Sequence, residues 1–194
     1  MVVHLPVRQL IEAAWIAFLL YWGWSARHVK GTRRSEPLLP RLFKYWLPLL
    51  LAVLLVEPIP LLDASVLGVR LVPDTAWLPV LGMATTWAGV LFACRARQVL
   101  GSNWSSEVQL KQDHELILRG PYRLVRHPIY TGLLLAFLGT ALALGELRGL
   151  VAFALVACSF WIKLRLEERW MREQFGSAYA DYMRRVKALV PGLL

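Results

Sequence analysis

Long apolar segments dominate this sequence and limit what it can fold into. Five of them approach the roughly 20 helical residues that cross a hydrocarbon layer of about 30 Å. They are Ala13–Trp24 with its flanks, Tyr45–Leu62, Ala76–Cys94, Ile129–Leu144 and Leu150–Ile162. With 57% hydrophobic and only 18% charged residues, the chain is too apolar for a water-soluble globule. The sequence therefore predicts an all-α integral membrane protein with about five transmembrane helices.

The last two apolar segments are separated by a short turn at 145–149, so they are expected to form a C-terminal helical hairpin. The whole chain, 1–194, is interpreted as a single membrane domain, in which 1–94 holds the first three transmembrane helices. The remaining region, 95–194, consists of a polar loop (95–127), the hairpin (128–168) and a C-terminal tail (169–194).

Positive charges are distributed unevenly among the connections between the apolar segments. Of the 22 Lys and Arg residues, 19 lie in loop 27–44, in loop 95–127 or in the tail from Lys163 onward. Cytoplasmic loops of membrane proteins are enriched in Lys and Arg. The split therefore predicts a multi-pass protein of a cytoplasmic or inner membrane, with both basic loops and the C-terminus in the cytosol. It also explains the net charge of +9 without nucleic acid as a partner.

The rest of the composition excludes several classes of site. Cys94 and Cys158 both lie in apolar runs, where two small buried side chains are expected rather than a disulfide or a metal site. The histidines and cysteines have no metal-ligand spacing, and the sequence contains no Gly-rich nucleotide-binding fingerprint. Neither a metal centre nor a soluble Rossmann-type domain is expected.

The polar loop and the tail are expected to carry short elements at the membrane surface. In the loop, 108–110 and 116–118 flank four polar residues in the manner of a β-hairpin. In the tail, Gly176 suits a helix end. A final amphipathic helix that could lie on the membrane surface is indicated by the i, i+3, i+4, i+7 spacing of Tyr179, Tyr182, Met183 and Val186.

The boundary between the polar loop and the fourth apolar segment is a first candidate site. Pro128 suits the first turn of a helix, where free N–H groups and the helix dipole attract anions. Arg126 and His127 stand at that helix start. The alternative is a collar of basic residues at the membrane surface with Tyr122 and Tyr130 as interfacial anchors. Anchoring alone requires neither a histidine beside the proline nor a tyrosine one turn later.

A second candidate site lies where the fifth apolar segment ends. Lys163 and Glu167 are four residues apart, Glu168 is adjacent, and Arg165 precedes Glu168 by three residues. These residues would be ordinary surface ion pairs if they lay in water. However, the apolar part of this helix is only about 20 Å long, at 1.5 Å per residue. Lys163 and Glu167 are therefore expected at headgroup depth or deeper, where ionisable groups usually mark function.

The C-terminal half resembles the isoprenylcysteine carboxyl methyltransferase family, within the wider group of membrane methyltransferases that includes phospholipid N-methyltransferases. The resemblance covers roughly 95–194. It is carried by an R-H-P-x-Y-x-G motif, by a downstream Glu pair and by the tail pattern F-G-x-x-Y-x-x-Y, which are Arg126–Gly132, Glu167-Glu168 and Phe175–Tyr182. Four further segments of the polar loop fit the family as well: Leu100–Trp104, Val108-Gln109, His114–Ile117 and Gly120–Tyr122.

The resemblance implies that 95–194 is a catalytic region and that S-adenosylmethionine is the methyl donor, held by the cytosolic loop, the hairpin and the tail. A lipophilic acceptor would reach it from the membrane lipid, and no metal would take part. The implied cofactor contacts are Gln109, His114, Leu116, Ile117, Tyr122, His127, Pro128, Tyr130 and Glu167.

The implied catalytic residues on the acceptor side are Lys163, Arg165 and Glu168. Eukaryotic members have an arginine where this chain has Lys163, so either Arg165 binds the acceptor carboxylate or the acceptor differs from a prenylcysteine carboxylate. Two converging cations favour an anionic or neutral acceptor. An amine served by Glu168 as base, or a small thiol, remains an alternative. An NADPH-dependent sterol-reductase-like protein and a non-catalytic membrane scaffold are more distant alternatives.

Overall fold

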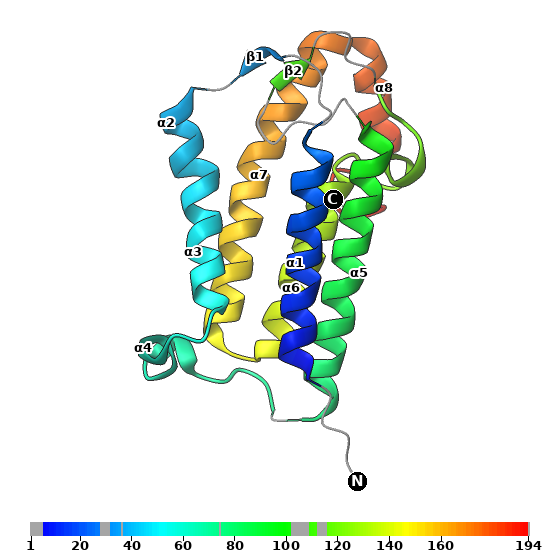
Figure 1. Ribbon diagram of the computed structural model, residues 1–194. Coiled ribbons are helices and arrows are strands. Elements are labelled where there is room, and N and C mark those ends of the chain that lie inside the picture. The colour runs from blue at the N-terminus through cyan, green and yellow to red at the C-terminus, as the bar shows by residue number, and fades with distance from the viewer. Residues whose placement is uncertain are drawn as a thin grey trace.

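The computed structural model describes 6–27, 32–35, 37–73, 75–101, 109–111 and 116–193, and it is a bundle of long helices (Figure 1). The long helices are α1 (Val7–Ser25), α5 (Trp77–Leu100), α6 (Pro128–Leu144), α7 (Leu147–Phe175) and a continuous helix made of α2 (Leu38–Arg41), the π-helical turn η1 (Leu42–Trp46) and α3 (Leu47–Val56). The short elements are α4 (Pro60–Asp63), α8 (Ser177–Arg185), the 3-10 turns η2 (Val66–Gly68) and η4 (Gly120–Arg123), and the strands β1 (Thr32–Ser35) and β2 (Gln109–Lys111). The predicted helical membrane fold with a C-terminal hairpin, α6–α7, is confirmed.

Several helices in the described part of the chain have the length and composition of membrane spans. Leu38–Val56, α5 and α7 are long and apolar enough to cross a bilayer, and α6 is an apolar helix of 17 residues. Their outer faces expose large apolar side chains, such as Leu39 at 68% and Leu91 at 61%. Such faces are stable against lipid and unfavourable in water. The expected total of about five transmembrane helices, with α1 as one of them, stays a prediction.

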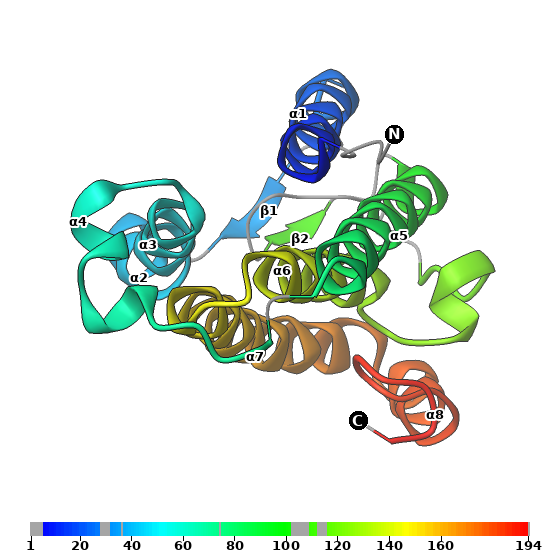
Figure 2. The same cartoon turned by 90° about the horizontal axis from the view of Figure 1, so that it is seen from below.

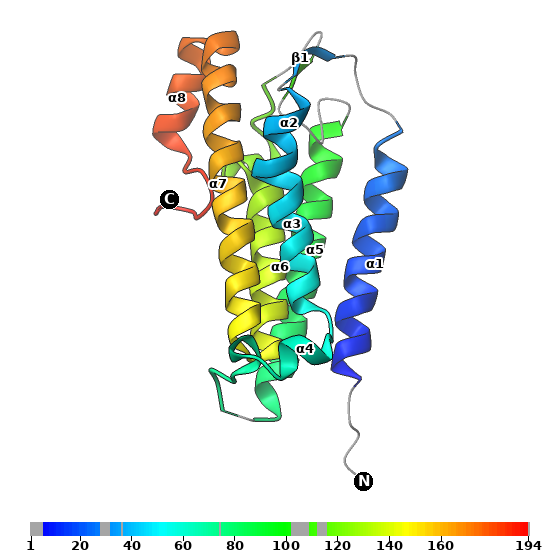
Figure 3. The ribbon, with the colours of Figure 1, turned by 90° about the vertical axis from the view of Figure 1, so that its left-hand side faces the viewer.

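The hairpin helix α6 lies at the centre of the bundle. Viewed along the helices, it lies between α5 and α7, with α1 packed on α5 and α3 packed on α7 (Figure 2). At the end of the bundle where α6 begins, α7 continues beyond α6, and α8 folds back beside that extension (Figure 3). We call this the tail end of the bundle, and we call the opposite end, with the α6–α7 turn, the turn end.

Small residues bring α5 and α6 into backbone contact. A Cβ atom added to Gly89 of α5 would lie 2.4 Å from both the Ala136 nitrogen and the Gly132 oxygen of α6. A Cβ atom on Gly139 would lie 2.4 Å from the Thr86 nitrogen. Membrane helices use glycine in this way because lipid supplies little apolar driving force, so that close packing must hold the helices together.

The turn end is closed by a buried arginine. Arg148 has a side chain only 5% exposed, and it pairs with Glu146 at 2.6 Å and with Asp63 at 2.8 Å. It also donates to the Glu57 carbonyl at 2.8 Å. Gly145 ends α6 in the left-handed conformation at φ 70°, as a helix C-terminus often requires. The contacts of Arg148 with Asp63 and with the Glu57 carbonyl therefore fix the hairpin turn to the connection between α3 and α5.

The polar loop does not form the predicted β-hairpin between 108–110 and 116–118. β2 pairs antiparallel with β1, with Ser35 opposite Gln109, and 116–118 is not a strand. The small sheet therefore joins the two loops at the tail end, rather than folding the second loop on itself. A local hairpin pattern does not reveal this pairing, because the partner lies more than 70 residues earlier in the chain.

Helix α8 packs on the protein through its aromatic face. Tyr179 is 2% exposed and Tyr182 is 4% exposed, and the Tyr182 hydroxyl donates to the Tyr122 carbonyl at 2.6 Å. The helix ends at Arg185, so Val186 lies beyond it in an extended conformation. The apolar face that the spacing indicated is thus used for tertiary packing, and its tyrosines are not available to a membrane surface.

Candidate active site at the tail end

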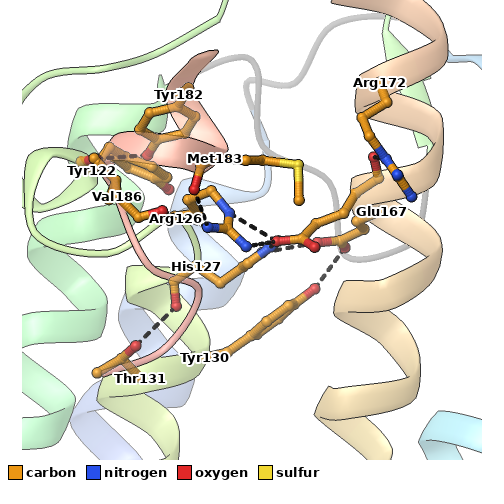
Figure 4. Close-up of polar contacts among 11 residues, drawn as sticks. Tyr122, Arg126, His127, Tyr130, Thr131, Glu167, Arg172, Tyr182, Met183 and Val186 are labelled. Carbon is orange, nitrogen blue, oxygen red and sulfur yellow. Dashed lines mark hydrogen bonds and ion pairs between the residues drawn. The ribbon is translucent and has the colours of Figure 1, made fainter. Parts of the chain in front are cut away.

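Four charged or ionisable side chains meet where α6 begins and α7 leaves the bundle (Figure 4). The antiparallel hairpin places the first turn of α6 beside the turn of α7 that holds Glu167 and Glu168, because α7 is the longer helix and continues beyond that point. Pro128 occupies the first helical position of α6 and is buried. The side chains that meet are those of Arg126, His127, Glu167 and Glu168.

Glu168 is tied to Arg126 in a buried ion pair. The Arg126 Nε and Nη2 atoms donate to the Glu168 Oε1 atom at 2.8 and 2.6 Å, and the two side chains are only 8% and 6% exposed. Arg126 also donates to the carbonyl groups of Val186 and Met183. The guanidinium therefore joins α7, α8 and the segment before α6 at one point.

His127 lies between the two glutamates. Its Nδ1 atom is 3.6 Å from Glu167 Oε2, and its Nε2 atom is 3.3 Å from Glu168 Oε1. Burial alone disfavours the imidazolium, but the hydrogen bonds and negative charges of Glu167 and Glu168 outweigh that effect and raise the pKa of His127 above its ordinary value. The two carboxylates therefore favour the imidazolium form of His127 more than water does in a free histidine.

Tyr130 fixes the position of Glu167. The Tyr130 hydroxyl donates to Glu167 Oε1 at 2.6 Å. Its ring stacks on His127 with centroids 5.5 Å apart and on Phe160 with centroids 4.8 Å apart. Of the two glutamates, Glu167 has the more accessible side chain, at 24% against 6%. Glu167 is therefore the carboxylate of the cluster that a ligand can reach.

The two cations predicted on α7 do not converge. The Lys163 ammonium lies 5.7 Å from the centre of the Tyr45 ring and 5.6 Å from that of Tyr130, so it adjoins the cluster. Arg165 is exposed, and its guanidinium lies over Trp161, 5.8 Å from the ring centre. The expectation that Lys163 and Arg165 converge on one acceptor site was wrong, because residues two apart on a helix point about 200° apart, at 3.6 residues per turn.

The start of α6 is covered by the C-terminal segment. Arg126 donates its backbone N–H to Lys187 O at 2.8 Å, and His127 donates to Ala188 O at 3.0 Å. The Thr131 hydroxyl donates to Leu189 O at 2.8 Å. Carbonyl oxygens therefore line this helix start, and the backbone groups of Arg126 and His127 do not form the anion site that the proline pattern predicted.

The other predicted contact residues lie around the cluster or outside the described chain. Tyr122 is buried in η4, and burial raises the pKa of its hydroxyl. Ile117 packs against the same core, and Leu116 beside it is partly buried. Gln109 is described only by its backbone in β2, and His114 lies outside the described residues. Among the described residues, no group of three His, Cys, Asp or Glu side chains suits a metal ion.

The sequence interpretation did not assign roles to several residues that build the site. Arg126 belongs to the R-H-P motif and was expected at the start of α6, but its ion pair with Glu168 was not predicted, although its charge was a usable signal. The sequence did not indicate a role for 186–189, because an extended segment without helical periodicity is common. It did not indicate a role for Tyr45 either, because a tyrosine in an apolar run is equally common.

The raised pKa of His127 predicts a pH-dependent contribution to stability. A histidine with a folded-state pKa above its unfolded value of about 6.5 stabilises the fold fully below that value, and the contribution is lost as pH rises through the folded pKa. We expect the melting temperature of the wild type in detergent to exceed that of His127→Gln most at pH 6 and progressively less toward pH 9. A difference that grows with pH would contradict the protonated state of His127.

The sequence pattern of the phospholipid methyltransferase family matches 77–178, which includes α5, η4, α6 and α7. This match covers the hairpin and the whole cluster. The chain therefore belongs to this family of membrane proteins.

Individual relatives carry a more specific name. Protein-S-isoprenylcysteine O-methyltransferase B of Arabidopsis thaliana is 28% identical over 118 residues, covering 59% of this chain and 60% of the relative. A probable protein-S-isoprenylcysteine O-methyltransferase of Oryza sativa subsp. indica is 38% identical over 85 residues, 43% of this chain and 44% of the relative. The resemblance drawn from the motifs is thus confirmed. The chain spans about half of the length of these two relatives.

A third relative has a different printed name. Methanethiol S-methyltransferase 2 of Bradyrhizobium diazoefficiens is 45% identical over 74 residues, which cover 37% of this chain and 27% of the relative. Relatives named as isoprenylcysteine O-methyltransferases and a relative named as a methanethiol S-methyltransferase therefore both match this chain.

Proposed function

We propose that this protein is an S-adenosylmethionine-dependent methyltransferase that acts on a lipophilic acceptor, most simply the carboxylate of an isoprenylcysteine. The observation that carries the proposal is the contact of His127 and Tyr130 with the partly accessible Glu167 carboxylate, which lies within the family match. The names of the relatives support the same reaction class.

The chemistry of the cluster fits S-adenosylmethionine. Glu167 offers a partly accessible carboxylate for hydroxyl or ammonium groups, and Tyr130 and His127 orient it. Leu116 and Ile117, which are only partly buried, offer an aliphatic surface for the adenine base. When bound, the donor supplies a methyl group on a sulfonium centre, a chemistry that needs no metal. The protein's contribution is then positioning, which can supply several kcal/mol of the barrier.

Among the residues assigned to the acceptor, the geometry favours Lys163. Its ammonium adjoins Tyr130 and lies one helical turn before Glu167, whereas Arg165 lies on the outer face against Trp161. Glu168 is occupied by Arg126 and His127, so we assign it a positioning role rather than the role of a base. Lys163 is a point charge suited to orienting an anionic acceptor.

The direct test is transfer of a labelled methyl group. Purified protein in detergent is incubated with labelled S-adenosylmethionine and, in parallel, with a prenylated N-acylcysteine, a total lipid extract or small thiols, and the product is identified. Stabilisation by S-adenosylhomocysteine separates the proposal from the alternatives, because a ligand stabilises the protein that binds it. Stabilisation by NADPH instead would indicate a reductase, and stabilisation by neither would indicate a scaffold.

We further propose that the tail end faces the cytosol. Of the 22 positive charges, 19 belong to 27–44, to 95–127 or to the tail from Lys163 onward, and the helix ends that these ranges include lie at that end. In intact cells, a membrane-impermeant thiol reagent is expected to label Val66→Cys at the turn end and to spare Ser177→Cys at the tail end. Val66 is chosen because it is 74% exposed, whereas Arg148 at the same end is buried. Both variants are made without Cys94 and Cys158, and the reverse labelling pattern would overturn this orientation.

A thiol acceptor is the second candidate, favoured by the similarity to the methanethiol methyltransferase. The pH profile of kcat at saturating donor separates the two. A carboxylate with a pKa near 3.5 is fully ionised at neutral pH, so kcat is expected to stay nearly flat from about pH 6.5 to 9. A thiol with a pKa near 8.5, or an amine, would give a steep rise over the same range. A steep rise together with full activity of Lys163→Ala would refute the carboxylate acceptor.

A further inference from the structure

A π-helical turn interrupts the helix that packs beside the site. In η1, the Leu47 N–H bonds to Leu42 O, five residues earlier, although the helix is α-helical on both sides. Pro48 explains the interruption, since proline has no N–H to bond the carbonyl four residues earlier and its ring clashes with that group. That carbonyl belongs to Lys44, and the Ser159 hydroxyl of α7 donates to it at 2.9 Å.

One face of α7 connects this turn to the cluster. Ser159, Lys163 and Glu167 are spaced four residues apart, so they lie above one another on the same face. Ser159 donates a hydrogen bond to the π-helical turn, the Lys163 ammonium lies over the rings of both Tyr45 and Tyr130, and Glu167 accepts a hydrogen bond from Tyr130. Tyr45 is the one partly buried residue of η1, whose other members are exposed. The π-helical turn thus points this tyrosine ring at the α7 face that leads to Glu167.

Two aromatic rings near one ammonium change how that cation attracts an anion. Each ring holds the cation through its quadrupole and displaces water from one side. With fewer competing waters, the attraction between the ammonium and an incoming anion increases, because the effective dielectric constant is lower. The arrangement also restrains the flexible lysine stem, which lowers the entropy lost when the ammonium contacts a ligand.

We propose that Tyr45 is a positioning residue that, together with Tyr130, orients Lys163 so that the site distinguishes an acceptor carboxylate from its methyl ester. The inference rests on the proposed carboxylate acceptor and adds a residue outside the family match, which begins at 77. It also assigns a function to the π-helical turn. A continuous α-helix in this register would rotate the tyrosine by about 100°, away from Lys163.

Binding of N-acetyl-S-farnesylcysteine and of its methyl ester, measured by calorimetry with S-adenosylhomocysteine present, tests the proposal. The wild type is expected to prefer the acid by at least tenfold. Tyr45→Leu is expected to reduce the preference to threefold or less, and Tyr45→Phe and Tyr45→Trp, which keep a ring, are expected to retain it. Trp46→Leu is the matched control, because Trp46 is an exposed residue of the same turn.

A register experiment adds a sharper criterion. Deleting Trp46 is expected to move Tyr45 into an outward position and abolish the preference. Adding Lys44→Tyr to the deletion is expected to restore it, because residue 44 then takes the inward position. In every variant the affinity for S-adenosylhomocysteine should stay within about twofold of the wild type.

Three results would overturn the inference. They are equal binding of acid and ester by the wild type, a preference that survives in Tyr45→Leu, and a loss of S-adenosylhomocysteine affinity that parallels the loss of preference, which would indicate a purely structural role. A wild type that prefers the acid but transfers no methyl group would refute the proposed reaction while leaving the inference intact. Because binding is the readout, the two failures are distinguishable.

Discussion

Replacing Glu167 by Ala is expected to weaken the binding of S-adenosylhomocysteine by at least about tenfold, which corresponds to about 1.4 kcal/mol. Glu167 is the accessible carboxylate of the cluster, and the Tyr130 hydroxyl and the His127 ring hold it in place. The same loss is expected for His127→Ala, because the imidazole adjoins both glutamates and stacks on Tyr130. Calorimetry on protein in detergent measures both affinities.

The controls for this prediction separate donor binding from folding. Glu173→Gln changes a carboxylate on the exposed part of the same helix and is expected to leave the affinity unchanged. Glu167→Gln keeps the size of the side chain and an acceptor for the Tyr130 hydroxyl, so it is expected to lose affinity with a smaller loss of melting temperature than Glu167→Ala. Wild-type affinity in both Glu167→Ala and His127→Ala would remove the cluster from the donor site.

The helical membrane fold and the positions of His127 and Glu167 in the site were predictable, because both depend on local sequence. Apolar segments of bilayer length gave the helices. The proline beside His127 marked the start of α6, and Glu167 lay near the end of the apolar part of α7. A helical hairpin necessarily brings those two positions together. The ion pairs of His127 and the Tyr130–Glu167 hydrogen bond realise this juxtaposition.

The errors arose where the partner is distant in sequence. β2 pairs with β1, α8 packs on η4, and the C-terminal segment covers the start of α6. Each of these contacts satisfies backbone or aromatic groups that appeared free when only the neighbouring sequence was considered. Arg165 is a different case, because helical geometry alone places it about 200° from Lys163.

Two features were present in the sequence but were not used. Small residues recur with the spacing 4, 3, 4 at Gly82, Thr86, Gly89 and Ala93, and again at Gly132, Ala136, Gly139 and Ala143. Such repeats are typical of close helix pairs in membranes. A proline within an apolar span likewise indicates a helix irregularity, and Pro48 lies two residues after the π-helical turn.

The contact between Gly89 and Gly132 carries the largest expected effect on folding. A Cβ atom on Gly89 would lie 2.4 Å from backbone atoms of α6, and one on Gly132 would lie 2.6 Å from the Ala93 nitrogen and the Gly89 oxygen of α5. Backbone atoms cannot rotate away as a side chain end can. A methyl group at either position therefore forces α5 and α6 apart along the whole interface between them. That interface includes the hydrogen bond from the Thr86 hydroxyl to the Ala136 carbonyl.

Gly89→Ala and Gly132→Ala are each expected to destabilise the protein by about 3 kcal/mol, at the upper end of typical overpacking costs. The double variant is expected to lose less than the sum, because a seam opened by one methyl group already accommodates the other. Gly23→Ala is the matched control, since nothing lies within 4 Å of a Cβ atom there, and alanine is the better helix former by about 1 kcal/mol. Melting temperatures in detergent measure all four, and Gly89→Ala melting at or above the wild-type temperature would show that α5 and α6 do not depend on backbone contact.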